Sequence, residues 1–317
     1  MARKKAVNLN LLYQKAQQAE GKGDLAAAEK YYREALSNQQ NLGTWGVLSW
    51  LLFSKGAFKE ALEAAKKMRN LALKNKSRRM MALSSCLTGL IHQAAGRKAL
   101  AERFYREALE AKPRSETNVF LGSLLEELGR SSEAKLCYQK ALEIDPGNYE
   151  AHFNLGKWYK AHGDYDRAIK YLRRAIDLSG NFPAAVSQLA IVMWQYGYTG
   201  FKLAKELLEE ALVKNIADTE NHLLLGFTYK LLGKKKDAEQ QFRFAAEQLE
   251  PNTCAFIALA CFLANDMNED AEAEANFKKA IDLEPENELP HYYYGKFLLD
   301  RGEAEKGKEH LAQANRS

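Results

Sequence analysis

The stretch SETNVFLGSLLEELGRSSEAKLCYQKALEIDPGN, residues 115–148, is followed directly by YEAHFNLGKWYKAHGDYDRAIKYLRRAIDLSGNF, residues 149–182. The two segments share one pattern, because residues of the same kind recur after 34 positions. The clearest recurrences are Leu121, Gly122, Gly129, Ala134 and Ala141, which return as Leu155, Gly156, Gly163, Ala168 and Ala175. A fixed period of this length predicts a solenoid, in which one small unit is repeated and stacked along the chain.

Each copy is predicted to form two helices joined by a tight turn. The apolar residues of the first half fall at spacings of three and four, as on one face of a helix: Leu121, Leu124, Leu125 and Leu128. Gly129 ends this helix, and a second one is expected from Ser132 to Ile144, before the turn Asp145–Asn148. One such hairpin cannot bury its apolar face alone, so neighbouring copies must stack.

This period and its recurring residues resemble the tetratricopeptide repeat (TPR) family, and the resemblance can be followed through nearly the whole chain. It implies an all-α fold, a right-handed superhelical solenoid of about nine helix-turn-helix units. The repeats are expected to begin near residues 9, 42, 82, 115, 149, 183, 219, 253 and 288. They would form a single array over residues 9–317, behind a basic N-terminal segment of residues 1–8.

Three of the expected repeats contain additional residues, and in the first repeat Lys15 and Ala16 replace the usual Leu-Gly pair. The second helix of the second repeat continues without a breaker to about Lys76. The sixth repeat has two additional residues in the turn around Gly197, which we expect to lie in a surface loop. The eighth repeat has one inserted residue, and its turn, Asn265–Glu269, lacks glycine.

The composition excludes several classes of protein. The 317 residues include 46 basic and 41 acidic ones, a net charge of +5 with both signs interspersed, which does not by itself indicate nucleic-acid binding. Four cysteines without zinc-ligand spacing indicate a reduced setting, and we expect a cytoplasmic protein. The longest apolar run, Ala255–Ala264, is too short to span a bilayer, and the first residues lack the apolar core of a signal peptide.

Sequence motifs of enzymes are absent. The chain contains no glycine-rich phosphate-binding motif, no HExxH and no GxSxG. His152, His222 and His291 occupy the fourth position of their repeats, where the TPR family prefers a bulky packing residue, and His92 occupies a position that other repeats fill with tyrosine. We therefore predict packing roles for these histidines, no catalytic residue, no metal and no cofactor.

The resemblance to the TPR family also implies a binding surface. The first helices of TPR arrays line a concave groove, and the corresponding positions here are unusually apolar and aromatic, with single lysines between them. Such a surface predicts a non-catalytic scaffold or adaptor that holds an extended or helical peptide of a partner protein. The predicted groove residues are Trp50, Phe53, Val119, Phe153, Lys157, Lys160, Ile191, Trp194, Phe227, Lys230, Ile257, Tyr292 and Lys296. The alternative for each residue is packing against the next repeat.

A second candidate surface is basic. Between residues 66 and 79 the chain has seven basic residues and no acidic one: Lys66, Lys67, Arg69, Lys74, Lys76, Arg78 and Arg79. Two interpretations remain open, a solvated helix end, where cations favour the carboxyl-terminal dipole, and a docking patch for an acidic protein or an RNA backbone. No aromatic residue is interleaved for base stacking, which argues against nucleic acid.

The sequence does not identify the client, and it supports one further hypothesis of a different class. The protein could be a structural subunit of a larger or self-associated assembly, which binds through the ends of the array. No separate capping helix follows the ninth repeat, so either the polar last helix caps the array or its inner face, Leu311 and Ala314, contacts a partner or another copy.

Overall fold

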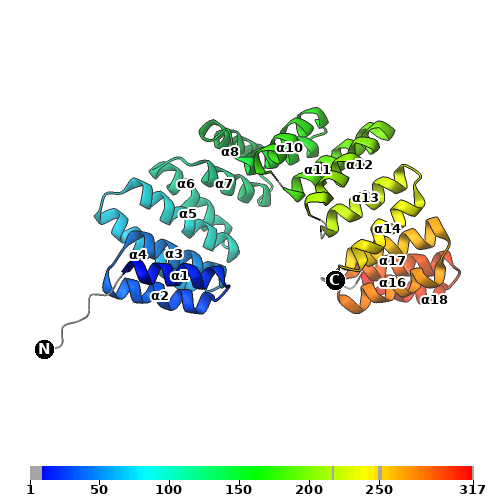
Figure 1. Cartoon of the computed structure of the whole chain (residues 1–317), viewed down its shortest axis with the longest axis horizontal. Helices are drawn as coiled ribbons and strands as arrows, with labels where there is room; N and C mark the ends of the chain where they lie inside the picture. Colours follow the sequence, from blue (N-terminus) through cyan, green and yellow to red (C-terminus); the bar gives the residue numbers. More distant parts are fainter. Residues whose placement is uncertain (1–8, 181, 216–217, 249–251, 316–317) are drawn as a thin grey trace. The chain divides into compact units, whose positions relative to one another are not determined.

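The structure is a computed structural model that describes residues 9–180, 182–215, 218–248 and 252–315. Every regular element among these residues is helical, and none is a strand. The described residues form eighteen α-helices in nine successive hairpins. The coloured ribbon of Figure 1 follows their order along the chain. The all-α fold of about nine helix-turn-helix units predicted from the sequence is therefore confirmed.

The chain divides into two compact units, one ending at Leu155 and the other beginning at Gly156. The helices of the first unit are α1 (Leu9–Gly21), α2 (Leu25–Asn38), α3 (Leu42–Ser54), α4 (Phe58–Lys74), α5 (Arg78–Ala94), α6 (Lys98–Ala111), α7 (Ser115–Glu127) and α8 (Ser131–Ile144). The division falls within α9 (Tyr149–Ala161). The helices of the second unit are α10 (Tyr165–Ser179), α11 (Pro183–Met193), α12 (Gly197–Lys214), α13 (Thr219–Leu231), α14 (Lys235–Ala246), α15 (Thr253–Phe262), α16 (Asp270–Leu283), α17 (Glu288–Asp300) and α18 (Ala304–Ala314).

The two helices of a hairpin approach closely where the first helix has a glycine, because glycine has no side chain. In α7 this residue is Gly122, which follows Leu121. A Cβ atom added to Gly122 would lie 2.5 Å from Cε1 of Tyr138, whose side chain is fully buried. The hairpins α9–α10 and α13–α14 repeat this contact, with Gly156 against Leu172 and Gly226 against Phe242. The recurrence explains why these residue types reappear at a fixed period.

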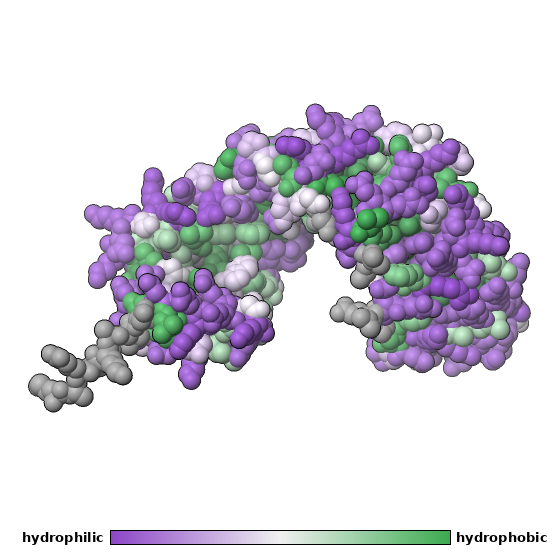
Figure 2. Space-filling model, viewed as in Figure 1, coloured by the Kyte–Doolittle hydropathy of each residue, from purple (hydrophilic) through white to green (hydrophobic). Residues whose placement is uncertain are grey.

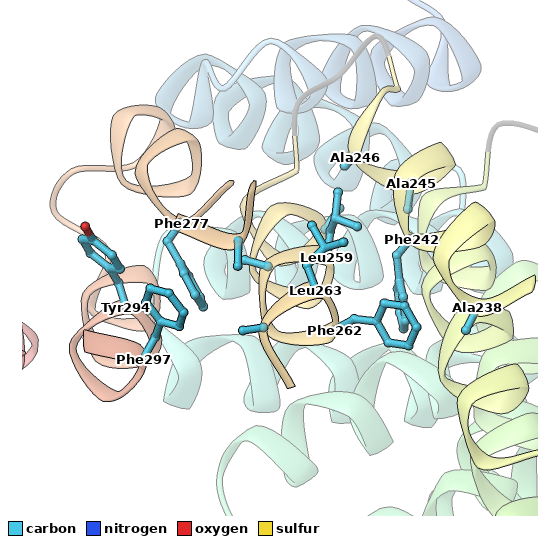
Figure 3. Close-up of a cluster of buried hydrophobic side chains, with 14 of the residues drawn as sticks. Ala238, Phe242, Ala245, Ala246, Leu259, Phe262, Leu263, Phe277, Tyr294 and Phe297 are labelled. Carbon is cyan, nitrogen blue, oxygen red and sulfur yellow. The ribbon is translucent and has the colours of Figure 1, made fainter. Parts of the chain in front are cut away.

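Aromatic side chains fill the space between successive hairpins of the second unit. The ring of Phe242 on α14 lies 5.2 Å from that of Phe262 on α15, centroid to centroid. Further along, the ring of Phe277 on α16 lies 5.6 Å from Tyr294 and 5.4 Å from Phe297, both on α17 (Figure 3). These rings form one continuous buried cluster, which stacks three hairpins on each other.

The third hairpin begins at Arg78, four residues before the predicted start at Ala82, whereas the other eight hairpins begin at their predicted residues. The reason lies in the junction between α4 and α5, each of which has 17 residues. Lys76 turns the chain with a φ of 52°, and the Ser77 hydroxyl accepts a hydrogen bond from the backbone N–H of Met80 at 3.4 Å. The additional residues thus lengthen both helices instead of forming a loop.

The surface loop expected in the sixth repeat is absent from the described residues, so that prediction was wrong. A short 3₁₀ helix, Trp194–Tyr196, leads directly into α12, which has 18 residues. Gly197 makes this possible with a φ of 63°, and Gly200 packs so closely that an added Cβ would overlap the carbonyl oxygen of Met193. The two extra residues therefore become helix.

The inserted residue of the eighth repeat also becomes helix. Leu263–Met267 forms a single π-helical turn after α15, and the wider i→i+5 turn takes up the additional residue. Asn268 then takes the place of the missing glycine, with a φ of 59°. Asparagine tolerates this left-handed conformation better than most residues.

Candidate functional site

Trp194 of the second unit is held between two neighbouring first helices. It follows α11 directly, and its indole Nε1–H donates a hydrogen bond of 3.1 Å to the hydroxyl oxygen of Thr228 on α13. That hydroxyl is fully buried and donates in turn to the carbonyl oxygen of Leu224 at 2.7 Å. The indole is half-buried, so part of its ring remains available to a partner while its position is fixed.

Phe227 stands on α13 immediately before Thr228, and its side chain is 39% exposed. Its ring makes an edge-to-face contact with the ring of buried Phe242, with centroids 5.0 Å apart and an interplanar angle of 72°. Edge-to-face contacts of this kind are favourable, so the core fixes the orientation of an exposed aromatic ring.

Charged residues flank these aromatic rings. Lys230, one turn after Phe227, pairs with Asp266 at 2.7 Å, and Asp266 belongs to the π turn that the insertion creates. On the other side, Lys160 of α9 donates a hydrogen bond to the side-chain oxygen of Gln188 on α11. Burial, together with the charge of Lys157, lowers the pKa of Lys160 from its usual value.

We name the Trp194–Phe227 surface after its two rings and define it as Ile191, Trp194, Phe227 and Lys230. All four were predicted from the sequence, and the hydrogen bond from Trp194 brings the two helices that carry them together. Asp266 was not predicted as the partner of Lys230, because the contact depends on how the inserted residue is accommodated. The inserted residue was the only feature of the sequence that indicated an altered structure at this turn.

Two predicted groove residues are excluded by their burial. Val119 on α7 is 4% exposed and Ile257 on α15 is 7% exposed, so neither offers a surface to a partner. Their short apolar side chains pack within the fold, which is the alternative that the sequence left open. Phe153 and Lys157 on α9 are half-buried, and they lie in different units.

The remaining predicted residues form two small exposed clusters. In the first unit, Trp50 is 53% exposed, and its ring centroid lies 5.5 Å from that of the half-buried Phe53. In the second unit, Tyr292 is 39% exposed, and the ammonium group of Lys296 lies 4.9 Å from the centroid of its ring. Both clusters present an aromatic ring to solvent. Figure 2 shows that hydrophilic residues cover most of the visible face of each unit, with apolar patches between them.

The basic residues of the α4–α5 junction are exposed, apart from half-buried Arg69. The guanidinium of Arg69 pairs with the carboxylate of Glu107 on α6 at 2.6 Å. None of the other six basic residues has an ion pair with a residue in the described part of the chain. The junction is therefore a concentration of positive charge that the fold itself does not neutralise.

A cleft of about 640 Å³ between α10, α11 and α12 was not predicted from the sequence. Its apolar lining includes Ile176, Phe182, Leu203 and Leu207, and charged residues such as Glu206 stand beside them. The available signal was the spacing of Leu203 and Leu207, which places two leucines on a face of α12 other than the buried one.

Several of the histidines and cysteines take part in packing. His222 donates a hydrogen bond of 2.7 Å from Nδ1–H to Oε1 of Gln241, and His92 stacks on Phe104 with centroids 5.4 Å apart. Burial raises the pKa of the Cys261 thiol to about 11, so this thiol is protonated at neutral pH. Within the residues that the structure covers, no cluster of three or more potential ligands could hold a metal ion. In the same residues, no helix has both the length and the apolarity needed to cross a membrane.

Repeated helical hairpins, with exposed aromatic residues on their first helices, define a helical-repeat protein. Comparison with known proteins identifies the repeat. Models described as tetratricopeptide repeat match residues 13–78, 84–115, 115–148 and 137–170. The chain belongs to the tetratricopeptide repeat family, whose members generally act as protein-interaction scaffolds.

Relatives and solved structures agree with this assignment. The chain is 25% identical over 305 residues to Protein CTR9 homolog of Arabidopsis thaliana. This match covers 92% of this chain and 27% of that protein. It is 24% identical to BBSome complex member bbs-4 of Caenorhabditis elegans, over 62% of this chain and 42% of that protein. A tetratricopeptide repeat protein from Parabacteroides merdae shares the fold, with a TM-score of 0.55 and 18% identity over 80% of this chain and 98% of that one. The chain thus spans less than half the length of these two curated relatives.

Proposed function

We propose that this protein is a non-catalytic scaffold that binds an extended or helical segment of a partner protein on the Trp194–Phe227 surface. The observation that carries the proposal is Phe227, a large aromatic side chain that is 39% exposed and yet fixed by an edge-to-face contact with the core. Exposed aromatic residues held in this way supply a large share of the binding energy at protein interfaces.

Pre-organisation supports this choice of surface. Trp194 is held by its hydrogen bond to Thr228, and Phe227 by its contact with Phe242, so neither ring needs to be ordered when a partner binds. Immobilising a mobile side chain at an interface costs about 0.5–1.5 kcal/mol, and rigid anchors avoid most of this cost.

The flanking charges indicate what else the partner segment contains. Lys230 is paired with Asp266, and Lys160 is hydrogen-bonded to Gln188, yet each keeps further N–H donors on its ammonium group. A partner segment with apolar side chains spaced for the two rings, and with carbonyl or carboxylate oxygens beside them, would match this surface.

The test compares Phe227→Glu with Val213→Glu, a matched control that adds the same charge at a residue 81% exposed on α12. Each variant is used for affinity capture from a lysate of the cells that make the protein, followed by mass spectrometry. A partner retained by the wild type and the control, and lost by Phe227→Glu, would support the proposal. Equal capture by all three proteins would refute it, provided that circular dichroism shows unchanged helix content.

A second candidate function is a structural subunit of a larger assembly, and the similarity to BBSome complex member bbs-4 favours it. In this chain the last hairpin exposes Leu289, Tyr293 and Leu299, while Ala314 on α18 is buried. Self-association through this hairpin predicts a mass that increases with concentration. A strictly monomeric mass at high micromolar concentration in analytical ultracentrifugation would exclude the self-associating form.

A further inference from the structure

The junction between α4 and α5 contains more helix than the repeat requires. Both helices have 17 residues, whereas α6 and α8 have 14 each. We call residues 66–81 the basic extension. It is an ordered part of the fold, since Met68 and Ala72 on its inner side are 4% and 0% exposed.

The stability of the fold does not account for the charges of the basic extension. Cations are favourable only in the last turn of a helix, which explains Lys74 but neither Lys66 nor Lys67. Arg78 and Arg79 stand in the first turn of α5, where the helix dipole disfavours positive charge and where no acidic residue is present. These arginines oppose folding slightly, so they need another explanation.

The basic extension also exposes an apolar side chain. Leu73 is 49% exposed, and Lys74 and Lys76 follow it closely along the chain. A spacing of seven places it on the same face of α4 as Lys66, and Lys74 follows it directly. The exposed face of α4 therefore combines unneutralised positive charge with one leucine. Glu63, one turn before Lys66, is the nearest acidic residue on this face.

We propose that the basic extension binds an acidic segment of a partner protein, in which carboxylates neutralise the basic residues and an apolar side chain packs on Leu73. Charge complementarity selects the acidic partner, because six cations without ion pairs among the described residues repel one another until an anion binds. The exposed leucine and the lack of aromatic residues between positions 66 and 79 favour a peptide over RNA. This site is separate from the Trp194–Phe227 surface and does not depend on it.

The experiment measures binding of fluorescein-labelled peptides to the full chain by fluorescence anisotropy. One peptide contains only glutamate, a second contains glutamate interrupted by leucine, and an oligouridylate serves as the RNA probe. The variants are Arg78→Glu with Arg79→Glu, and Leu73→Ser. Their matched controls, at exposed residues elsewhere in the chain, are Lys170→Glu with Lys236→Glu, and Leu136→Ser.

The double arginine variant is expected to weaken binding of both peptides by about tenfold, because it reverses two charges at the site. The scattered lysine control should change binding by less than about twofold at physiological ionic strength, since distant charges are screened. The double arginine variant should also raise the denaturation midpoint, because acidic residues are favourable in the first turn of α5. A merely structural role for these arginines predicts the opposite shift of the midpoint.

Leu73→Ser should weaken binding of the leucine-containing peptide by about threefold and leave the all-glutamate peptide unchanged, because it removes only the apolar contact. The Leu136→Ser control should affect neither peptide. Equal losses in the arginine variant and the lysine control would overturn the proposal, because net charge alone would then explain binding. Tighter binding of the oligouridylate than of either peptide, or no binding of any peptide, would also overturn it.

Discussion

The turns of this repeat lead to a prediction about stability that can be tested by reciprocal substitutions. Most hairpins turn at a glycine with positive φ, such as Gly129 with a φ of 73°. The connection between the second and third hairpins, from α4 to α5, uses Lys76 in the same conformation, with a φ of 52°. Left-handed backbone costs a residue with a Cβ atom about 1–2 kcal/mol, so Lys76 holds strain that glycine would not. We therefore expect Lys76→Gly to stabilise the protein and Gly129→Ala to destabilise it.

The magnitude follows from two opposing effects. Replacing lysine by glycine removes about 1–2 kcal/mol of strain from the folded state. The greater conformational entropy of glycine in the unfolded chain lowers the stability by about 0.4–1 kcal/mol. Lys76→Gly should therefore raise the free energy of unfolding by about 0.5–1 kcal/mol. Gly129→Ala should lower it by a similar amount, and no atom lies within 4 Å of the added Cβ, so steric overlap makes no contribution.

The assay is urea denaturation followed by far-ultraviolet circular dichroism, with a common m-value for the wild type and both variants. Gly21→Ala is a suitable control, because Gly21 ends α1, has open space around its Cβ position and lacks a positive φ. It should leave stability unchanged or raise it slightly. A Lys76→Gly variant that is less stable than the wild type, or a Gly129→Ala variant of equal stability, would refute the reasoning.

Three further predictions concern the core, one histidine and the thiols. Tyr138→Ala should lower the free energy of unfolding by about 3–5 kcal/mol, because it leaves a cavity against Gly122. Tyr138→Phe should lower the free energy of unfolding far less. Similar urea midpoints for the two variants would contradict this prediction. Burial and the neighbouring His291 lower the pKa of His310, so the folded state favours its neutral form, and stability should fall as the pH drops below about 6.5. The variant His310→Phe should flatten that dependence in thermal denaturation, and an unchanged pH profile would reject the explanation. Exposed Cys254 should react with Ellman's reagent at neutral pH well before Cys261, whose pKa is raised to about 11, and equal rates in single-cysteine variants would show that the Cys261 thiol is not protected.

Much of the fold could be predicted from the sequence because its determinants are local. Leu121, Gly122 and Gly129 recur after 34 residues as Leu155, Gly156 and Gly163, and helix periodicity is visible in any short window. A solenoid needs only contacts between neighbouring units, so a local pattern is enough to predict the architecture. The insertions were also visible in the sequence, but their form was not, because a loop, a 3₁₀ turn and a π turn all accommodate extra residues.

The tertiary structure alone decided which predicted residues are available to a partner. Val119, Ile257 and Tyr292 occupy the same position of three repeats, yet the first two are buried and the third is 39% exposed. The exposure of each side chain depends on its size and on how the first helices of the neighbouring repeats cover it. Those helices are not close to the residue in sequence. The same reason applies to Phe227, whose sequence position indicated a surface residue but not the contact with Phe242 that fixes its ring. In this protein, residue spacing determined the repeat, and packing between repeats determined its surfaces.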